Sequence, residues 1–363
     1  MKHGHPLRYL LLGLFILSLP LLFNPLNADE AQLVQIRRGD TISYLAFKIY
    51  GMYDLRMVEL LRQENPQLKD IDLIYPGQQV RFPKPVAMRN WLRGKTSKPG
   101  EPSSPEAFKE TRQAKGDSPK EEILPGMQVR ANKGVVTYLE GQVQSKKSGE
   151  PQWSQARPNQ ILNEKDQIKV LAQSRAELIL DSQSVMRLSE NTLLTLHKLE
   201  EETASQKETT RMDLSLGKLW TRAAKLFNPA SRLEVRTPTA IAGVQGTIYQ
   251  VSVPNERSTN IQVFEGAVNV YNPFPATKAP AAGRAIPLSE PQEVKGPQEV
   301  PGPTAVSREE WTQIVLRQFQ QITVTDRDIS RPTSFDINQE RQSEWLRWNE
   351  ERDLDFQPPA RPR

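Results

Sequence analysis

The 363-residue sequence contains no cysteine, which excludes disulfide bonds and thiolate chemistry. Histidine is almost as scarce, because His3 and His5 stand in front of the first apolar run and only His197 remains beyond it. A single histidine without cysteine is too little for the usual zinc sites. Neither a Gly-x-Ser-x-Gly elbow nor a Gly-x-x-x-x-Gly-Lys-Ser/Thr phosphate loop occurs. We therefore expect a protein that is not an enzyme, carries no metal or other cofactor and acts by binding.

Long apolar runs are scarce as well, and the clearest one extends from Leu10 to Phe23. It follows Lys2 and Arg8, and Ala28 offers a small residue for cleavage, a pattern typical of a signal peptide over residues 1–28. The run is shorter than the ~20 residues that span a bilayer, so we expect cleavage and export to the periplasm or cell wall. An uncleaved inner-membrane anchor is the alternative. Without Lys2 and Arg8 the formal charge of +5 falls to about +3, too little to indicate nucleic-acid binding.

Residues 33–84 have the pattern of a small independent module. A strand, two helices and a closing strand are indicated by the apolar spacing of Val34 and Ile36, of Ile42, Leu45, Ala46 and Ile49, of Leu55, Val58 and Leu61, and of Val80 and Phe82. Asp40 and Asp54 are expected to cap the two helices, while Gly51 ends the first and Asn65-Pro66 the second. The order predicts a compact βααβ unit.

The motifs that separate these elements resemble those of the LysM family: Gly39-Asp40-Thr41-Ile42, Asn65-Pro66 and Pro76-Gly77-Gln78. The resemblance implies binding of N-acetylglucosamine-containing glycans, chiefly peptidoglycan, in a shallow groove between two loops. Carried over by motif, the glycan-binding residues are Gly39, Asp40, Thr41 and Ile42 in the first loop and Asp70, Ile71, Asp72, Leu73 and Ile74 in the second. In the purely structural alternative Asp40 is a helix cap and Ile42 and Ile74 are core residues.

Residues 85–125 are rich in Pro, Lys, Glu and Ser and predict a flexible linker, since such a composition buries too little apolar surface to fold.

Over residues 126–275 apolar and polar residues alternate strictly, as in Ala176–Leu180 and Met212–Leu216. Short alternating segments about ten residues apart, separated by Asn, Asp, Ser and Gly, predict an all-β domain. A sandwich, a barrel and a stacked β structure all fit this pattern.

Within this region the segment Leu233–Val251 resembles the core motif of the FecR domain, and the flanking residues extend the resemblance to about residues 160–271. The resemblance implies the fold and an extracytoplasmic location. The residues that carry it and that we expect to form a structural turn, with ligand contact as the alternative, are Thr237, Pro238, Gly243, Gly246 and Thr247. The sequence departs from the family at Gln245, where the family usually has a basic residue, and at Ile248, so a polar contact of the family at this turn is in doubt.

The founding member of that family passes an outer-membrane signal to a sigma factor through a cytoplasmic helical domain. Only about nine residues precede the apolar run here, so the resemblance leaves a signalling role without support from the sequence. It supports the β fold and the compartment.

The last third of the sequence is expected to contain a linker or edge segment, two helices and a tail. Residues 276–304 are rich in Pro and indicate a linker or an edge segment of the β domain. Residues 305–352 are expected to be helical: one helix is capped by Ser307 and has Trp311, Ile314, Val315 and Phe319 on one face, and a second covers 344–352. We expect these helices to pack on the β domain, with partner binding as the alternative, and residues 353–363 to form a disordered tail.

The architecture is thus multidomain, with a LysM-like βααβ module, an all-β FecR-like domain and C-terminal helices. It predicts a non-catalytic envelope protein that tethers its β domain to peptidoglycan or another N-acetylglucosamine glycan. One alternative is a FecR-type sensor or regulator of envelope signals that has an envelope protein as partner. The other is a wall hydrolase, because the two carboxylates of such an enzyme have no fixed spacing in sequence.

Overall fold

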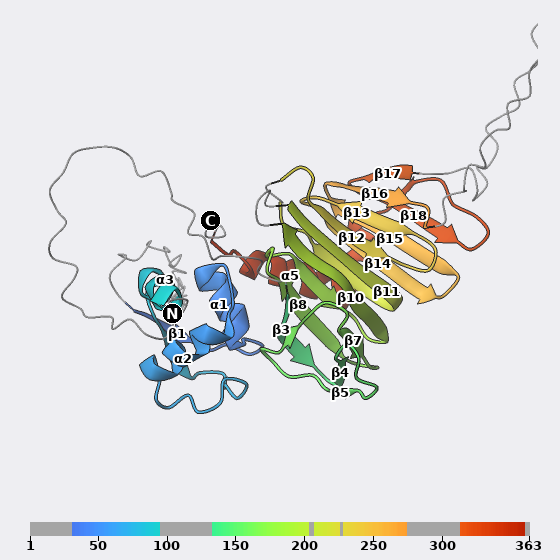
Figure 1. The fold of residues 1–363 in the computed structure, drawn as a ribbon. Helices are drawn as coiled ribbons and strands as arrows, with labels where there is room; N and C mark the ends of the chain where they lie inside the picture. Colours follow the sequence, from blue (N-terminus) through green and yellow to red (C-terminus); the bar gives the residue numbers. More distant parts are fainter. Residues whose placement is uncertain (1–30, 95–132, 203–206, 226–227, 274–312, 360–363) are drawn as a thin grey trace, which may run out of the picture.

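The computed structural model describes residues 31–94, 133–202, 207–225, 228–273 and 313–359 (Figure 1). The expected signal peptide, residues 95–125 of the expected linker and the Pro-rich segment 276–304 lie outside these residues. The described chain forms an N-terminal module (residues 31–94) and a β domain (residues 133–334), and Figure 1 shows a C-terminal helix lying between the two. Within the described residues, the helices are all too short or too polar to cross a membrane.

The N-terminal module has the order that the sequence predicts, with one addition at its end. Its elements are β1 (Gln32–Gln35), α1 (Ile42–Tyr50), α2 (Leu55–Glu64), β2 (Gln79–Phe82) and α3 (Pro85–Gly94). β1 and β2 pair antiparallel, with Val34 opposite Val80. The side chain of Asn65 ties the end of α2 to this sheet, because it accepts the Arg81 N–H and donates to the Arg81 carbonyl, both at 2.7 Å.

The two helix starts differ in one respect from the prediction. Asp54 caps α2 as expected. Helix α1 is capped by Thr41, whose hydroxyl accepts the Tyr44 N–H at 3.1 Å, so the predicted capping role of Asp40 is wrong. Asp40 instead accepts the Arg37 N–H at 2.8 Å and closes the loop in front of the helix. The shift by one residue leaves both side chains hydrogen-bonded.

The predicted linker 85–125 is wrong at its start, where α3 continues the module. Met88 and Leu92 are buried and Trp91 packs beside them, a spacing that gives a short helix one apolar face. The Trp91 indole N–H also donates to the Arg56 carbonyl on α2. The apolar face therefore outweighs the polar composition of this segment.

The β domain consists of two sheets that share the long strand β11 (Lys207–Arg222). In order across the first sheet are β6 (Ile161–Leu162), β3 (Gly134–Glu140), β8 (Arg175–Leu180), β9 (Val185–Leu188), β11, β14 (Ile248–Asn255), β15 (Ser258–Glu265), β18 (Gln320–Thr325) and β19 (Thr333–Ser334). In order across the second are β5 (Ser154–Gln155), β4 (Val143–Lys146), β7 (Gln167–Val170), β10 (Thr192–Glu202), β11, β12 (Arg232–Arg236), β13 (Ile241–Val244), β16 (Ala267–Tyr271) and β17 (Gln313–Arg317).

Strand alternation explains how the sheets pack. One continuous core lies between them and takes Leu178 and Val251 from the first sheet and Val170 and Val235 from the second. Of the architectures left open by the sequence, the two packed sheets are the one found. The opposite face of the first sheet is also apolar, and Val135, Ile179 and Val185 share a core with the N-terminal module. Both faces of β3, β8 and β9 are therefore covered.

The helix predicted over residues 307–319 is wrong wherever the structure describes it. Residues from Gln313 onward form β17, which pairs with β16, and a turn at Phe319 leads back into β18. Ile314 and Leu316 alternate rather than following a helical period, and Leu316 is buried against the sheet. Pairing with an open sheet edge outweighs the weak helical pattern. Ser307 and Trp311 lie outside the described residues.

The second predicted helix is present and longer than expected. Helix α5 spans Glu344–Asp355 after a short helix α4 (Ile337–Glu340), and Ser343 caps α5 through the Leu346 N–H. The expected disordered tail is wrong up to Pro359, because Phe356 is fully buried in the core of the N-terminal module. Residues 360–363 lie outside the described chain.

Candidate functional site

The two loops predicted to bind glycan do lie together, at the junction with the β domain. A small cleft of about 160 Å³ is lined by Gly39, Asp40 and Thr41 from the first loop and Ile71, Asp72 and Ile74 from the second. The opposite wall belongs to the β domain and consists of Tyr138, Leu139, Pro158 and Asn159. Pockets for small ligands usually measure about 300–1,000 Å³, so this cleft is too small for a glycan chain.

The side chain of Asn159 fills the space between the loops. Its carbonyl oxygen accepts the Ser43 backbone N–H at 2.7 Å. Its amide nitrogen donates to the Ile71 carbonyl at 3.0 Å and to Asp72 Oδ1 at 2.9 Å. Asn159 is 4 % exposed, so these bonds are shielded from water. A single carboxamide thus connects both predicted loops to the β domain.

The Ser43 N–H is available because of where α1 begins. The first N–H groups of a helix have no partner within it. The Thr41 hydroxyl serves the Tyr44 N–H, which leaves the Ser43 N–H pointing out of the helix end toward Asn159. Asn159 itself has a φ of 63°, the left-handed conformation that Asn adopts more easily than most residues. Both backbone geometries place the carboxamide in the cleft.

Further contacts close the junction around this group. The Thr41 hydroxyl donates to the Thr137 carbonyl at 2.8 Å. Gly39 has a φ of +87°, and a Cβ placed on it would lie 2.9 Å from the ring of Tyr138. Gly39 therefore allows both the turn and the close approach of the β domain. Burial beneath this contact raises the pKa of Asp40, against the stabilising hydrogen bond from the Arg37 N–H.

The other predicted glycan-binding residues take different positions. Ile42 is fully buried in the module and matches the structural alternative. Asp70 accepts the Asp72 N–H at 2.9 Å and shapes the second loop. Leu73 is 59 % exposed and lies outside the cleft lining, whereas Ile74 lines it. The structure thus unites Gly39, Asp40, Thr41, Ile71, Asp72 and Ile74, and separates Ile42, Asp70 and Leu73 from them.

A second group of contacts is ionic and lies between the β domain and α5; we call it the clasp (Glu177 and Arg187 of the β domain, which are fully buried, with Arg352 and Asp353 of α5). The Glu177 carboxylate accepts from Arg187 Nε at 2.6 Å and from Arg352 Nη2 at 2.7 Å. Arg187 also donates to Asp353 Oδ1 at 2.7 Å. The Trp220 indole N–H donates to the other oxygen of Asp353. Two carboxylates and two guanidinium groups thus balance in charge beneath α5.

The electrostatics of the clasp follow from this pairing. Desolvation by burial would raise the pKa of Glu177, but the adjacent Arg352 and Arg187 outweigh it and lower that pKa to about 2. For Asp353, desolvation exceeds the effect of Arg187 and the pKa is raised. Glu177 is therefore the charged centre of the clasp, and its ionised form is the one that the fold stabilises.

The end of α5 extends from the clasp onto the module. Asp355 accepts hydrogen bonds from the Tyr44 hydroxyl at 2.8 Å and from Lys48 Nζ at 2.9 Å, both on α1. The Arg352 guanidinium lies 4.7 Å from the ring centres of Tyr44 and Tyr138. With Phe356 buried in the module core, α5 joins the two bodies through charge, hydrogen bonds and apolar packing.

Sequence reasoning missed the residues of the β domain at this junction. A usable signal existed for the clasp, because Glu177 and Arg187 are opposite charges in neighbouring apolar strands, Ala176–Leu180 and Val185–Leu188. Such charges are rarely buried unless they are paired. Asn159 gave no comparable signal, since Asn in a loop after Pro158 is ordinary turn chemistry.

The residues of the predicted FecR-like turn make contacts within the described chain. Thr237 accepts the N–H groups of Thr239 and Ala240, and the Thr247 hydroxyl donates to the Ala267 carbonyl at 3.0 Å. Gly246 has a φ of +61°, whereas a Cβ on Gly243 would lie 3.1 Å from the Tyr271 ring. Pro238 lies between Thr237 and Thr239 in this turn.

Gln245, which departs from the family pattern, makes its own polar contacts. Its amide donates to the carbonyls of Pro229 and Ser231.

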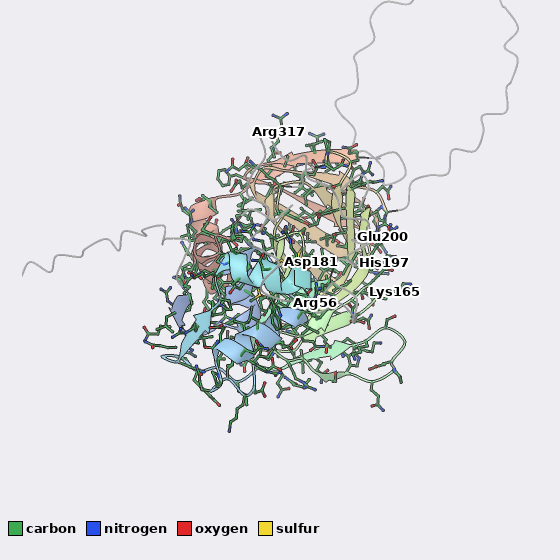
Figure 2. All side chains as sticks on the ribbon, turned by 60° about the vertical axis from the view of Figure 1, so that its left-hand side comes forward. Arg56, Lys165, Asp181, His197, Glu200 and Arg317 are labelled. Atoms are coloured by element: carbon green, nitrogen blue, oxygen red, sulfur yellow. The ribbon has the colours of Figure 1, made fainter. Side chains whose placement is uncertain are left out.

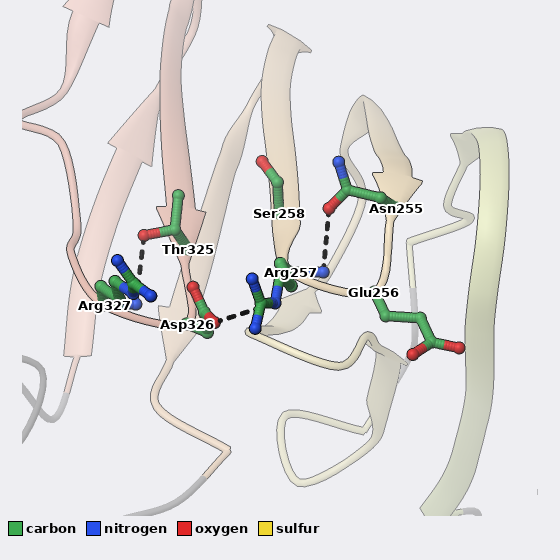
Figure 3. A pocket seen from close by; sticks show the side chains of 7 residues that line it. All are labelled: Asn255, Glu256, Arg257, Ser258, Thr325, Asp326 and Arg327. Carbon is green, nitrogen blue, oxygen red and sulfur yellow. Dashed lines mark hydrogen bonds and ion pairs between the residues drawn. The ribbon is translucent and has the colours of Figure 1, made fainter.

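Other surface features give less indication of a functional site. A wider hollow lies at the far end of the first sheet, where Arg257 pairs with Asp326 at 3.4 Å (Figure 3). Its walls are two exposed turns, and Figure 3 shows their polar groups bonded to each other.

His197 lies beside Lys165 and Glu200 on the β domain (Figure 2) and contacts Asp213 at 2.9 Å. Among the described residues, acids and histidines form no cluster suited to a metal ion.

Comparison with known proteins finds a family match for part of the β domain. Residues 166–269 match the family described as FecR protein, which confirms that part of the resemblance expected for about residues 160–271. This segment extends from just before β7 into β16. No curated protein matches the chain.

Two solved structures of a candidate anti-sigma factor from Parabacteroides distasonis ATCC 8503 are similar to the chain at 16 % and 15 % identity, with TM-scores of 0.33 and 0.32. Each alignment covers 50 % of this chain and 64 % or 63 % of the other. The chain thus spans less than two thirds of these proteins, and similarity at this level bears on neither fold nor function.

Proposed function

We propose that the chain is a non-catalytic regulator of the bacterial envelope, in which a LysM-like glycan-binding module is docked on a FecR-like β domain. It acts outside the cytoplasm, and an envelope protein reads the position of its β domain. The FecR match over residues 166–269 supports the β domain as a member of a regulatory class. The strand–helix–helix–strand order and the loop motifs of residues 31–84 support the module.

One observation favours a regulator over a simple wall tether. The predicted glycan loops face the β domain, and the Asn159 side chain occupies the space between them. A tether needs an open groove, whereas here a ligand at the two loops changes the junction itself. Occupancy of the module is thus coupled to the arrangement of the β domain, and such coupling is what a sensor requires.

Glycan remains the input that the chemistry of the loops favours. The cleft offers a backbone N–H from Ser43 and a backbone carbonyl from Ile71, a donor and an acceptor that match an acetamido group. Apolar contact is available from Ile71 and Ile74. The tether predicted from sequence is the second candidate function, because it uses the same loops without any change at the junction.

A distance measurement separates the two. The chain lacks cysteine, so a Leu55→Cys and Arg317→Cys pair carries two spin labels without background. Leu55 is 58 % exposed on α2, and Arg317 lies at the end of β17. The regulator predicts that chitopentaose, an N-acetylglucosamine oligomer, shifts the distance between the labels. The tether predicts binding without a shift.

The matched control places both labels within the β domain, at Arg317 and Lys165, where either function predicts no change. Absence of binding at millimolar chitopentaose would remove glycan as the input. A bound protein with an unchanged distance would contradict regulation by the module.

A further inference from the structure

We infer that the Asn159 side chain is an internal stand-in for the acetamido group of the ligand, so that glycan binding and docking of the module exclude each other. We call this contact the latch (Asn159 with Ser43, Ile71 and Asp72). The inference rests on the proposed glycan-binding function and specifies how the same site is regulated.

The chemistry of the two groups is alike. An acetamido group presents one carbonyl oxygen and one N–H on the same planar unit, and a carboxamide side chain presents the same pair. Asn159 uses both: its oxygen accepts from the Ser43 N–H, and its nitrogen donates to the Ile71 carbonyl. The backbone groups that suit the acetamido group of a sugar are therefore already bonded.

The occupied position cannot hold both groups. Asn159 is 4 % exposed and the remaining cleft measures about 160 Å³. Tyr138 closes the cleft beside Gly39, where a single added carbon on Gly39 would lie 2.9 Å from the ring. A sugar residue that reaches Ser43 and Ile71 must therefore displace Asn159 and move the β domain off the loops.

Opening the latch leaves a second attachment in place. The clasp joins α5 to the β domain, and α5 also holds α1, because Tyr44 and Lys48 donate hydrogen bonds to Asp355. Neither Glu177 nor Arg187 lines the cleft. Displacement of Asn159 must also break the Thr41–Thr137 hydrogen bond and part the module from Val135, Ile179 and Val185, while α5 still holds the module. This motion is the one that the labels at Leu55 and Arg317 report.

In the free protein the latch is closed, and this weakens the binding of glycan. The apparent affinity for glycan is the intrinsic affinity multiplied by the fraction of molecules in the open state. Because the three hydrogen bonds of the latch contribute to the closed state, removing them should tighten glycan binding by about tenfold. The gain appears without any new contact to the sugar, since Asn159 belongs to the β domain.

Three full-length variants test this. Asn159→Gly removes the carboxamide and keeps the left-handed backbone, and Asn159→Asp replaces the donating amide by an acceptor facing Asp72. Gln160→Ala is the matched control, because the Gln160 amide nitrogen donates to Ser145 within the β domain. Chitopentaose affinity is measured by calorimetry, and undocking by the distance between labels at Leu55 and Arg317.

We expect both Asn159 variants to bind about tenfold more tightly than the wild type, with the label distance already shifted before ligand is added, and Gln160→Ala to match the wild type. Equal affinities in all four proteins would overturn the latch and leave the glycan site intact. Undocked variants that still fail to bind would instead overturn glycan as the ligand, and with it the proposed function.

Discussion

The latch and the clasp hold the junction by opposite means: the latch joins the module to the β domain directly, and the clasp joins α5, which packs on the module, to the β domain. The latch is a neutral carboxamide with three hydrogen bonds at a cleft open to solvent on one side. The clasp is a balanced set of charges whose centre, Glu177 with Arg187, is fully buried. A ligand with the same donor and acceptor can replace the carboxamide, whereas no soluble ligand reaches the clasp. The latch is thus a contact that a ligand can replace, whereas the clasp keeps α5, on which the module packs, fixed to the β domain.

This difference also separates stability from regulation. Buried ion pairs are costly to break because each remaining charge is left uncompensated. Exchange of one hydrogen-bonded group for another changes the free energy little. Substitutions in the clasp should therefore act on folding, and substitutions in the latch on ligand affinity.

The largest effect is expected from Glu177→Gln. It leaves Arg187 and Arg352 facing a neutral amide at a buried position, and we expect the free energy of unfolding to fall by about 3–5 kcal/mol. Glu344→Gln is the control, because Glu344 is 74 % exposed where it pairs with Arg175 and surface pairs contribute little. Chemical denaturation measures both. Equal losses would refute the special role of the buried pair.

The second largest effect is expected from truncating Phe356, the buried residue at the end of α5. Phe356→Ala empties a fully buried position in the module core beside Tyr44, and we expect a loss of ~3 kcal/mol. Leu354→Ala, two residues earlier at a side chain that is 78 % exposed, should change nothing. Hydrogen exchange in α1 reports the result: faster exchange only in the Phe356 variant is expected, and unchanged exchange would show that α5 does not anchor the module.

Acid should weaken the clasp. The pKa of Glu177 is lowered to about 2 from a usual value of 4.5, so its contribution is complete above pH 4.5 and is lost as the pH falls toward 2. The shift corresponds to a contribution on the order of 3 kcal/mol. Denaturation midpoints between pH 5 and 2.5 should therefore fall, and more steeply than in Glu177→Gln. Parallel pH profiles would contradict this assignment.

A smaller effect should distinguish Gly39 from Gly77. Both have left-handed backbones, with φ of +87° and +88°, so alanine costs each about 1–2 kcal/mol of strain. Only Gly39 faces Tyr138, whereas a Cβ on Gly77 meets no atom within 4 Å. Gly39→Ala should therefore also loosen the junction and tighten chitopentaose binding, measured by calorimetry. Equal affinities of the two variants would show that Tyr138 does not help to close the cleft.

The sequence was sufficient for elements whose causes are local. The caps and stops at Asp54, Gly51 and Asn65 placed the helices of the module, and alternation placed most strands of the β domain. It failed where a distant partner decides the structure. The segment from Gln313 becomes a strand because β16 offers an edge, and α3 forms because α2 offers an apolar face.

The candidate site was even less predictable from local sequence patterns than the fold. Motifs in one segment located both loops, yet the residue between them, Asn159, lies 116 positions from its partner Ser43. Arg352 is 175 positions from Glu177. Local patterns cannot register such pairs, and a strand residue such as Glu177, which alternation alone would place in solvent, is buried only because α5 covers it.

One spectrum would test the central claim directly, because each contact has its own N–H reporter. The side-chain amide of Asn159 reports the latch and the indole N–H of Trp220, bonded to Asp353, reports the clasp. With saturating chitopentaose, we predict that the Asn159 amide resonance moves to the position of a solvated amide while the Trp220 resonance stays. An Asn159 resonance that does not move when the glycan is bound would contradict the account.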